Sequence, residues 1–368
     1  MDSKLFAWVY SHFGEPSEKR IGGQAGIISN QLSFLGQEVL LYSPDLNKHI
    51  AELSNPNIKI PVVEKSGKIS LKSLSEVHGT PRVNWIFEFE KGLKTKDFVV
   101  PRDNRFILSS KSVNSKPVFD VNLKTKLPEL GKLVDVCYIS GYHRLEDSGD
   151  FAEEKHDLGL LKSKNKKLVL HYEYVRTKNP EILSVLPRFD SLGCDEVELR
   201  QLLELLGEDK QAKKVSSDDS NSIFEGAALL KKRLKVKRLH VHNLGYALNL
   251  YDYKPTLNDV IAMLFASSVT NTKAKFGKYV TFKKQHSFCI NEGLSHLGFK
   301  ALASFYRKHP HLGKNFLESG LGEDFILVPL HVVDKPVYTV GLGDTISSVS
   351  LGAEIALKKQ SLFSSTIF

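Results

Sequence analysis

The sequence predicts an α/β protein whose mostly parallel sheet is covered by helices on both faces, which is a doubly wound architecture. Val134 to Ser140 and Lys167 to His171 are apolar, strand-like stretches, and a charged helical stretch between them ends near Leu161. A second strand-to-helix transition, through two glycines, is predicted near the carboxyl end. Short strand-like segments between Glu38 and Val100 predict a smaller β-rich unit. Alternation of strands and helices is typical of a parallel sheet with helices on each side.

The composition is that of a soluble globular protein. The chain has 368 residues, of which 41% are hydrophobic and 25% charged, and this length is enough for two domains with a substantial core. No apolar run approaches the roughly 20 residues of a membrane span. The first ten residues lack the pattern of a secretory signal, so we expect a cytoplasmic protein. Cys137, Cys194 and Cys289 are few and far apart, which predicts reduced thiols rather than disulfides or a thiolate metal site.

The net charge of +9 raises the possibility of nucleic-acid binding. The lysines are scattered, however, and the two densest clusters, Lys162 to Lys167 and Lys231 to Arg238, directly precede apolar strands. Such clusters are usually solvated ends of helices and strands. An anionic small substrate explains a basic chain equally well, and we expect neither a nucleic-acid nor a membrane partner.

A glycine-rich loop lies near the amino terminus. Gly22, Gly23 and Gln24 lead into an apolar helical stretch that closes at Gly36. The glycines permit a ligand to approach the backbone, and the Gln24 amide suits sugar hydroxyls. Close packing of the helix is the alternative interpretation.

The next part of the chain is predicted to be a small lid domain. Glu38 to Tyr42 is predicted to be a short buried strand, and a small β-rich insertion is indicated by the strand-like segments Ile58 to Glu64, Ile69 to Leu74, Trp85 to Phe89 and Phe98 to Val100. We therefore place the lid at residues 45–112 and the core at residues 1–44 and 113–368. Within the lid, Arg102 and Arg105 could bind an anionic ligand, or they could form ordinary surface ion pairs.

Polar residues follow the predicted core strands. His171 and Glu173 lie at the carboxyl end of a strand, where open α/β sheets bind ligands. Asp195, Glu196 and Glu198 precede an apolar helix. These hard oxygen donors suit Mg²⁺ held largely through water. A buried salt-bridged histidine and a helix start stabilised by the helix dipole are the alternatives.

Two histidines lie in a further predicted strand. A helix from about Ile223 to Leu234 precedes a strand over Arg238 to His242. His240 and His242 resemble a metal pair, but no third ligand stands at a suitable spacing, so zinc is not expected. A later helix is predicted over Leu257 to Val269.

The carboxyl-terminal motif has the clearest chemistry. Lys335 to Val340 is predicted to be a buried strand, Gly341 and Gly343 a tight turn, and Asp344 the first residue of a helix. Free amides at a helix start bind anions, phosphate above all. A carboxylate beside a phosphate would repel it unless it serves as a base or a metal ligand, so phosphoryl transfer is indicated. Ordinary helix capping is the alternative.

These motifs, taken together and in order, resemble the archaeal ADP-dependent sugar kinases, which comprise ADP-dependent phosphofructokinases and glucokinases. The resemblance spans residues 20 to 350 and rests on five segments: Gly22 to Gly26, His171 to Glu173, Asp195 to Glu198, His240 to Tyr246 and Val340 to Thr345. It implies a ribokinase-like fold with a smaller lid, and transfer of the β-phosphate of ADP to a sugar hydroxyl, leaving AMP.

The resemblance also implies a role for each matching residue. Asp344 would be the general base, with Gly341 and Gly343 in the anion hole. Glu173, Glu196 and Glu198 would organise Mg²⁺. The nucleotide would be bound by His242, Asn243, Leu244, Gly245, Tyr246 and Val340, and the sugar by Gly22, Gly23 and Gln24.

The sugar is predicted from the lid. Its sequence looks more like the phosphofructokinase branch, in which Asn84 and Arg105 would meet the 6-phosphate of fructose 6-phosphate. A glucokinase or bifunctional enzyme is the alternative. Two departures from the family are visible. Asp195 stands where the family usually has Asn, and an upstream segment with a sugar contact is not seen, which leaves a truncated, non-catalytic binding relative as a third interpretation.

Overall fold

The computed structural model describes residues 3–76, 83–94, 96–101, 104–109, 116–281 and 293–364. Its centre is a six-stranded sheet in the order β10-β9-β8-β7-β6-β5. The strands are β5 (Val136–Ile139), β6 (Val169–Glu173), β7 (Ser191–Asp195), β8 (Arg238–Asn243), β9 (Tyr246–Tyr251) and β10 (Phe325–Pro329). Pairs from β5 to β8 are parallel, whereas β8–β9 and β9–β10 are antiparallel. The predicted mostly parallel α/β fold is therefore confirmed.

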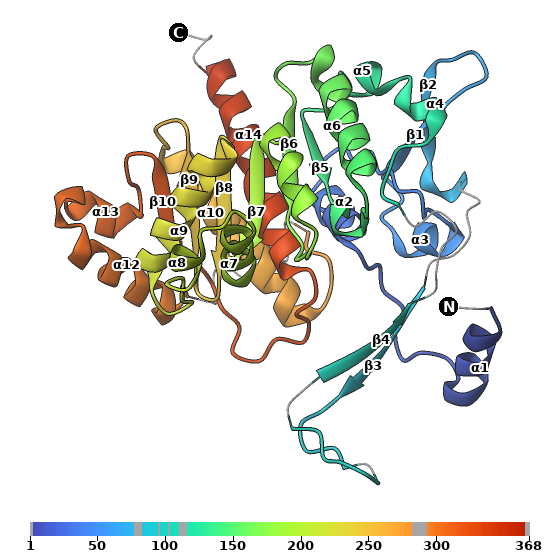
Figure 1. Cartoon of the computed structure of the whole chain (residues 1–368), viewed down its shortest axis with the longest axis horizontal. Helices are drawn as coiled ribbons and strands as arrows, with labels where there is room; N and C mark the ends of the chain where they lie inside the picture. Colours follow the sequence, from blue (N-terminus) through green and yellow to red (C-terminus); the bar gives the residue numbers. More distant parts are fainter. Residues whose placement is uncertain are drawn as a thin grey trace.

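Helices cover both faces of this sheet (Figure 1). One face is covered by α6 (Ser148–Ser163), α7 (Glu196–Leu205), α9 (Ser220–Leu234) and α12 (His296–Lys308). The other is covered by α2 (Gln24–Phe34), α10 (Leu257–Phe276) and α14 (Leu342–Ser364). Short helices complete the core domain: α4 (Val121–Lys124), α5 (Leu127–Leu130), η2 (Tyr142–Arg144), η3 (Pro180–Ser184), η4 (Leu186–Arg188), α8 (Asp209–Ala212), η5 (Pro310–Leu312) and α13 (Lys314–Ser319).

The strands present different chemistry to the two helical layers. Because side chains alternate along a strand, Leu170 and Tyr172 of β6 enter the large apolar cluster beneath α6 and α7. The alternate residues His171 and Glu173 point to the opposite face, toward α14. The same alternation in the neighbouring strands puts a buried polar row under α14, made of His171, Glu173, Ser191, Arg238 and His240. A buried polar row of this length needs internal partners, and it marks the face on which the candidate site lies.

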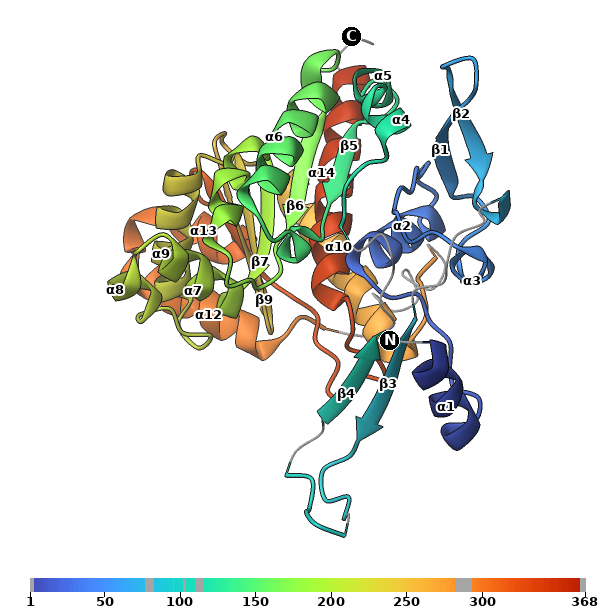
Figure 2. The same ribbon diagram turned by 45° about the vertical axis from the view of Figure 1, so that its right-hand side comes forward.

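The segment predicted as a lid contains two small structures. The first consists of α3 (Lys48–Leu53), β1 (Lys59–Val63), β2 (Ile69–Ser73) and η1 (Leu74–Glu76), with an apolar cluster that includes Leu41 and Ile58. The second is an antiparallel ribbon of β3 (Asn84–Phe89) and β4 (Asn104–Ser109). The ribbon projects from the body beside the amino-terminal helix α1 (Ser3–Phe13), as Figure 2 shows.

Aromatic contacts join α1 to the ribbon. The ring centroids of Tyr10 and Trp85 are 5.4 Å apart, and those of Phe13 and Phe87 are 4.9 Å apart, both edge to face. Such pairs contribute about 0.5–1.5 kcal/mol beyond the area they bury. The helix and ribbon therefore form one projecting unit.

Several predicted strands differ from the structure. Residues 38–42 form only a single bridge, between Leu40 and Lys59, and Phe98 to Val100 only a bridge between Lys94 and Val99. Conversely, β4, β7, β9 and β10 were not predicted. In β9 all six residues are buried, so this strand lacks the alternation of polar and apolar residues that reveals a half-exposed strand.

Two compositional predictions can be compared with the structure. No helix among the described residues is long and apolar enough to cross a membrane. Cys137 and Cys194 are free thiols, whereas Cys289 lies outside the described residues, as does Arg102.

Candidate active site

The stretch before α14 is not the buried strand that the sequence predicted. Residues 335–340 form an irregular loop, and Val337 is 69% exposed. The amides of Val337 and Tyr338 donate to the carbonyl of Ala274, at 2.9 and 3.1 Å, so the loop crosses the end of α10 instead of joining the sheet. The Arg20 guanidinium lies 4.1 Å above the Tyr338 ring and holds the other side of the loop.

The helix after this loop begins at Leu342, two residues earlier than predicted. The Gly341 carbonyl accepts from the Thr345 amide at 3.1 Å and from the Thr345 hydroxyl at 2.8 Å. Gly341 has φ +67°, which L side chains rarely adopt. These contacts close a tight turn directly before α14 and put Asp344 in the first turn of the helix.

Both glycines of this turn are required by close contacts. A Cβ at Gly341 would lie 2.5 Å from Ile27 Cδ1 of α2, and one at Gly343 would lie 2.5 Å from the imidazole Nε2 of His242. The start of α14 therefore lies against both α2 and the end of β8. Its unpaired amides and helix dipole together favour an anion.

Asp344 is the carboxylate closest to this anion-binding turn. Burial, together with the nearby charge of Glu173, raises its pKa to about 6. The Gln24 side-chain amide donates to Asp344 Oδ1 at 3.0 Å and to the backbone carbonyl of Glu173 at 3.4 Å. A positioned carboxylate with a pKa near 6 is ionised at neutral pH and basic enough to accept a proton from a hydroxyl group.

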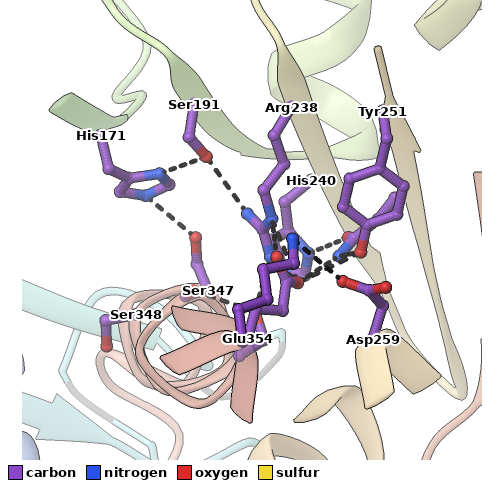
Figure 3. A network of polar contacts seen from close by, with 12 residues as sticks. His171, Ser191, Arg238, His240, Tyr251, Asp259, Ser347, Ser348 and Glu354 are labelled. Atoms are coloured by element: carbon purple, nitrogen blue, oxygen red, sulfur yellow. Dashed lines mark hydrogen bonds and ion pairs between the residues drawn. The ribbon is translucent and has the colours of Figure 1, made fainter. Parts of the chain in front are cut away.

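Glu173 contacts His171, which belongs to a buried hydrogen-bond network with Ser191 and Arg238; Figure 3 shows this network from His171 onward. His171 Nε2 lies 3.2 Å from Glu173 Oε2, and His171 Nδ1 lies 2.8 Å from the Ser191 hydroxyl. Arg238 Nη1 donates to the same hydroxyl at 3.2 Å. Because guanidinium only donates, the Ser191 hydroxyl accepts from Arg238. His171 Nε2 also lies 3.1 Å from the Ser347 hydroxyl of α14.

The far end of this network is an ion pair in the protein interior. Arg238 and Glu354 are 4% and 2% exposed, and Arg238 Nε and Nη2 both donate to the Glu354 carboxylate, the Nη2–Oε1 distance being 2.9 Å. Asn249 and Tyr251 also donate to Glu354 Oε1, at 3.2 and 3.1 Å. Burial, followed by the charge of Arg238, lowers the pKa of His171 to about 3, which keeps the imidazole neutral.

The carboxylates predicted to organise a metal ion come together at the ends of β6 and β7. Glu198 accepts from the Asp195 amide at 3.0 Å, and Asp195 accepts from the Glu198 amide at 2.7 Å, a reciprocal capping box at the start of α7. Burial and the charge of Asp195 raise the pKa of Glu198 to about 9, and burial raises that of Glu173 to about 7. Burial also raises the pKa of Glu196.

Burial is the main cause of these raised pKa values, and the charges of neighbouring carboxylates add to it for Glu173 and Glu198. Among the described residues no three His, Cys, Asp or Glu side chains are close enough to hold a metal ion directly. Hard carboxylate oxygens in a partly buried space do fit a hydrated Mg²⁺, which binds largely through water.

The predicted nucleotide-binding segment forms the turn between β8 and β9. His242 Nδ1 lies 3.9 Å from Glu173 Oε1, at the candidate site. Leu244 is 68% exposed, whereas Tyr246 is 4% exposed and packs in the core beneath α9 and α12. A Cβ at Gly245 would lie 2.8 Å from Leu297 Cβ, so α12 packs closely on this turn. Asn243 donates from its amide to the Ser217 carbonyl at 2.8 Å.

An open cleft of about 2110 Å³ runs from the ribbon to Gln24, which contacts Asp344, and to Val340, which precedes the glycine turn. It is lined on the core side by Gly22, Gly23, Gln24 and Val340, and on the ribbon side by Asn84 and Arg105. Arg105 stands opposite Glu88, and Asn84 opposite Ser109, so Asn84 and Arg105 lie on the same face of the ribbon. The cleft is larger than the roughly 300–1,000 Å³ of a typical ligand pocket.

Some charged residues of this region were not singled out from the sequence. Lys273 and Glu354 stand at helical spacing within apolar faces, among Val269 and Ala266 of α10 and Leu351 and Ile355 of α14. A charged residue on the buried face of a helix is the signal that could have identified them.

Comparison with known proteins matches this geometry to one family. The model described as "ADP-specific Phosphofructokinase/Glucokinase conserved region" matches residues 1–353. An ADP-specific phosphofructokinase of Thermococcus kodakarensis is 31% identical over 98% of this chain and 82% of its own length. An ADP-dependent glucose/glucosamine kinase of Pyrococcus furiosus is also 31% identical, over 92% of this chain and 76% of its own length. A solved ADP-dependent kinase in complex with fructose-6-phosphate and ADPβS has a TM-score of 0.85 and 32% identity, covering 96% of this chain and 84% of that one.

Proposed function

The chain belongs to the ADP-specific phosphofructokinase/glucokinase family, and we propose that it transfers the β-phosphoryl group of ADP to fructose 6-phosphate. The products are AMP and fructose 1,6-bisphosphate. The observation that carries this proposal is the position of Asp344 in the first turn of α14, half-buried at the glycine turn and hydrogen-bonded to Gln24 of the cleft.

In the proposed reaction Asp344 takes the proton from the attacking sugar hydroxyl. The oxygen of that hydroxyl forms a bond to the β-phosphorus of ADP, the bond from that phosphorus to the bridging oxygen breaks, and AMP leaves with that oxygen. The amides at Gly341 and Gly343 hold the transferring group in an anion hole. Gln24, which donates to Asp344 Oδ1 at 3.0 Å, keeps the carboxylate aimed at the cleft.

We include Mg²⁺ in this proposal, near Glu173, Glu196 and Glu198. Support comes from the hard oxygen donors and from the raised pKa of Glu173 and Glu198, which a cation would lower. When bound, the metal neutralises charge on the phosphate oxygens. His171, kept neutral and in contact with Ser191, lies 3.2 Å from Glu173 and would fix its carboxylate.

The nucleotide would be held by the turn from His242 to Tyr246 and by Val340. His242 lies beside Glu173, and Val340 lines the cleft next to the glycine turn, which supports the assignment of these two residues. Leu244, 68% exposed at the tip of the turn, has an apolar surface available to a flat base.

Arg105 supports fructose 6-phosphate over glucose. Its guanidinium makes no hydrogen bond or ion pair with any residue that the structure describes. A free guanidinium on the cleft side of the ribbon, on the same face as Asn84, suits a sugar phosphate. Relatives at equal identity include a glucose/glucosamine kinase, so glucose is the second candidate.

We further propose that the lid closes over the bound sugar. The cleft exceeds the volume of one ligand pocket, and the ribbon and α1 project from the body as one unit. Closure would bring Asn84 and Arg105 toward Gly22 and Gly23 and exclude water that could otherwise hydrolyse ADP.

A donor and acceptor panel tests the function. Purified protein with Mg²⁺ is given ADP or ATP, and fructose 6-phosphate, glucose or no sugar, and AMP is measured. We expect AMP with ADP and fructose 6-phosphate, and no comparable turnover with ATP. Turnover with glucose alone would replace the first candidate by the second, and well-folded protein that forms no sugar-dependent AMP would contradict a catalytic role.

The role of Arg105 is tested in the same assay. Arg105→Met should raise KM for fructose 6-phosphate by about 10-fold or more, because charge-assisted hydrogen bonds contribute about 1.5–3 kcal/mol, and should leave KM for ADP unchanged. Arg188→Met, on the far side of the core, is the matched control. An unchanged KM for the sugar phosphate would remove Arg105 from the site.

A further inference from the structure

A buried lysine beside the glycine turn has no part in the reaction as described so far. Lys273 lies in the last turn of α10 and is 3% exposed. Its ammonium donates to the Thr345 hydroxyl at 2.8 Å and lies 5.0 Å from the centre of the Tyr279 ring. α10 and α14 pack along each other, so this contact joins the end of one helix to the start of the other.

The ammonium is poorly compensated. It has three hydrogen-bond donors, and one acceptor is found for it among the described residues. None of their carboxylates lies within ion-pair distance of it; the closest charges that act on it are Asp344, which is attractive, and Arg20, which is repulsive. An unpaired buried charge of this kind is costly to a fold.

The surroundings increase this cost. The amino terminus of α14 carries the positive end of the helix dipole, which repels a cation. The ammonium and the start of α14 therefore place two sources of positive potential beside Asp344, and further negative charge at this position would be stabilised by both.

Phosphoryl transfer supplies that negative charge. We propose that Lys273 is a positioning residue for phosphoryl transfer, which fixes the Gly341–Thr345 turn through the Thr345 hydroxyl and provides a positive charge beside the transferring group. The inference rests on the proposed function and adds a residue to the same site. Lys273 acts through Thr345 and through its field, because its own side chain is shielded from the cleft.

The charge and the hydrogen bond can be separated by substitution. Lys273→Gln keeps a donor for Thr345 and removes the charge, whereas Lys273→Arg keeps the charge. Because Gln relieves an uncompensated buried cation, we expect Lys273→Gln to fold with an unchanged or higher melting temperature. Lys278→Gln, five residues further along the chain and exposed, is the matched control.

The experiment measures kcat, both KM values and ADP affinity by calorimetry. For Lys273→Gln we expect kcat to fall about 10- to 100-fold, which is at or slightly below the effect of removing one preorganised electrostatic contact. Both KM values and the ADP affinity should stay within about threefold of those of the unsubstituted protein. Lys273→Arg should retain more turnover than Lys273→Gln, and Lys278→Gln should match the unsubstituted protein.

A second readout does not depend on turnover. AMP, fructose 6-phosphate and aluminium fluoride together imitate the transferring group, and we expect Lys273→Gln to weaken binding of this combination by the same factor as kcat while leaving ADP binding intact. Full turnover in Lys273→Gln would show that Lys273 only braces the turn and would overturn the inference alone. Absence of turnover in the unsubstituted protein would overturn the proposed function and this inference with it.

Discussion

Replacing Asp344 by Asn separates the function of this side chain from its contribution to stability. Asn has nearly the same shape, and its Oδ1 can still accept from Gln24 Nε2, so the 3.0 Å contact is kept. The change removes the negative charge and the ability to take a proton. Substitution should therefore leave the glycine turn in place while removing the proposed base.

The expected loss of turnover follows from the role of a general base. Positioned acid–base groups contribute about 10²- to 10⁴-fold, so kcat should fall by that factor, or about 2.7 to 5.5 kcal/mol in activation free energy. ADP affinity should change little, because Asp344 is proposed to meet the sugar hydroxyl and not the nucleotide.

Stability should move in the opposite direction. The pKa of Asp344 is raised from 3.8 to about 6 in the folded protein, so the folded state disfavours the charged form. At pH 7 the folded carboxylate is charged at a cost of up to about 3 kcal/mol, at 1.36 kcal/mol per pKa unit. The side chain is partly accessible, so this value is an upper bound. Asn avoids the cost, and the difference should shrink as pH falls through about 6 and vanish only well below the unfolded pKa of 3.8, where the aspartate is protonated in both states.

The assay combines AMP formation, ADP calorimetry and urea denaturation at pH 7 and pH 4. Asp334→Asn, in the exposed loop before the turn, is the control and should change neither activity nor stability. Turnover of Asp344→Asn within about threefold of the unsubstituted protein would refute the base assignment, and marked destabilisation at pH 7 would refute the electrostatic argument.

Further predictions concern pH, the buried ion pair and the glycine turn. Because Asp344 must be deprotonated to act as a base and its pKa is about 6, kcat/KM should fall as pH drops through about 6, and a pH profile without an acid limb between 5 and 7 would contradict this. Glu354→Gln leaves Arg238 buried without its full counter-charge and should cost about 3–5 kcal/mol in urea denaturation, most of which Glu354→Leu with Arg238→Met should restore; a single substitution costing under about 1 kcal/mol would contradict it. Gly343→Ala puts a methyl group 2.5 Å from the neighbouring imidazole and should lower ADP affinity or kcat at least about 10-fold, whereas Gly159→Ala, where nothing lies within 4 Å, should do neither.

The fold class could be predicted because local hydrophobic patterns in the sequence show the alternation of strands and helices. The apolar stretches that became β5, β6 and β8 and the amphipathic helix α9 follow from the hydrophobic pattern, and the charged helix α6 from its place between two of these strands. The strands that were missed lack such a signal. In β9 every residue is buried, and β4 is exposed at nearly every position, so neither shows alternation. Their pairing depends on tertiary contacts.

The strand predicted over residues 335–340 is the clearest error. Its β-branched residues favour extended backbone, but its amides are taken by the Ala274 carbonyl at the end of α10. No local pattern reveals that partner. The predicted end of α10 at Val269 was also wrong, because the helix continues to Phe276. Lys273 lies in the last two turns, which were not predicted, and was therefore not considered.

Part of the site geometry could be predicted from the motifs near the strand ends. His171 and Glu173 face the same side because a strand alternates with period two, and this followed from their spacing. The contact between Gln24 and Asp344, which are 320 residues apart, could be expected only from the family resemblance. The chain from Glu354 through Arg238 and Ser191 could not be expected at all, since each link joins a different element.

Transfer of an isotopic label tests the central claim most directly. The protein is mixed with Mg²⁺, fructose 6-phosphate and ADP labelled at the β-phosphorus, and the products are separated. We predict that the label appears in fructose 1,6-bisphosphate in the same amount as unlabelled AMP is formed, and that Asp344→Asn slows this transfer about 10²- to 10⁴-fold. Label found only in inorganic phosphate, or retained in ADP, would contradict the account.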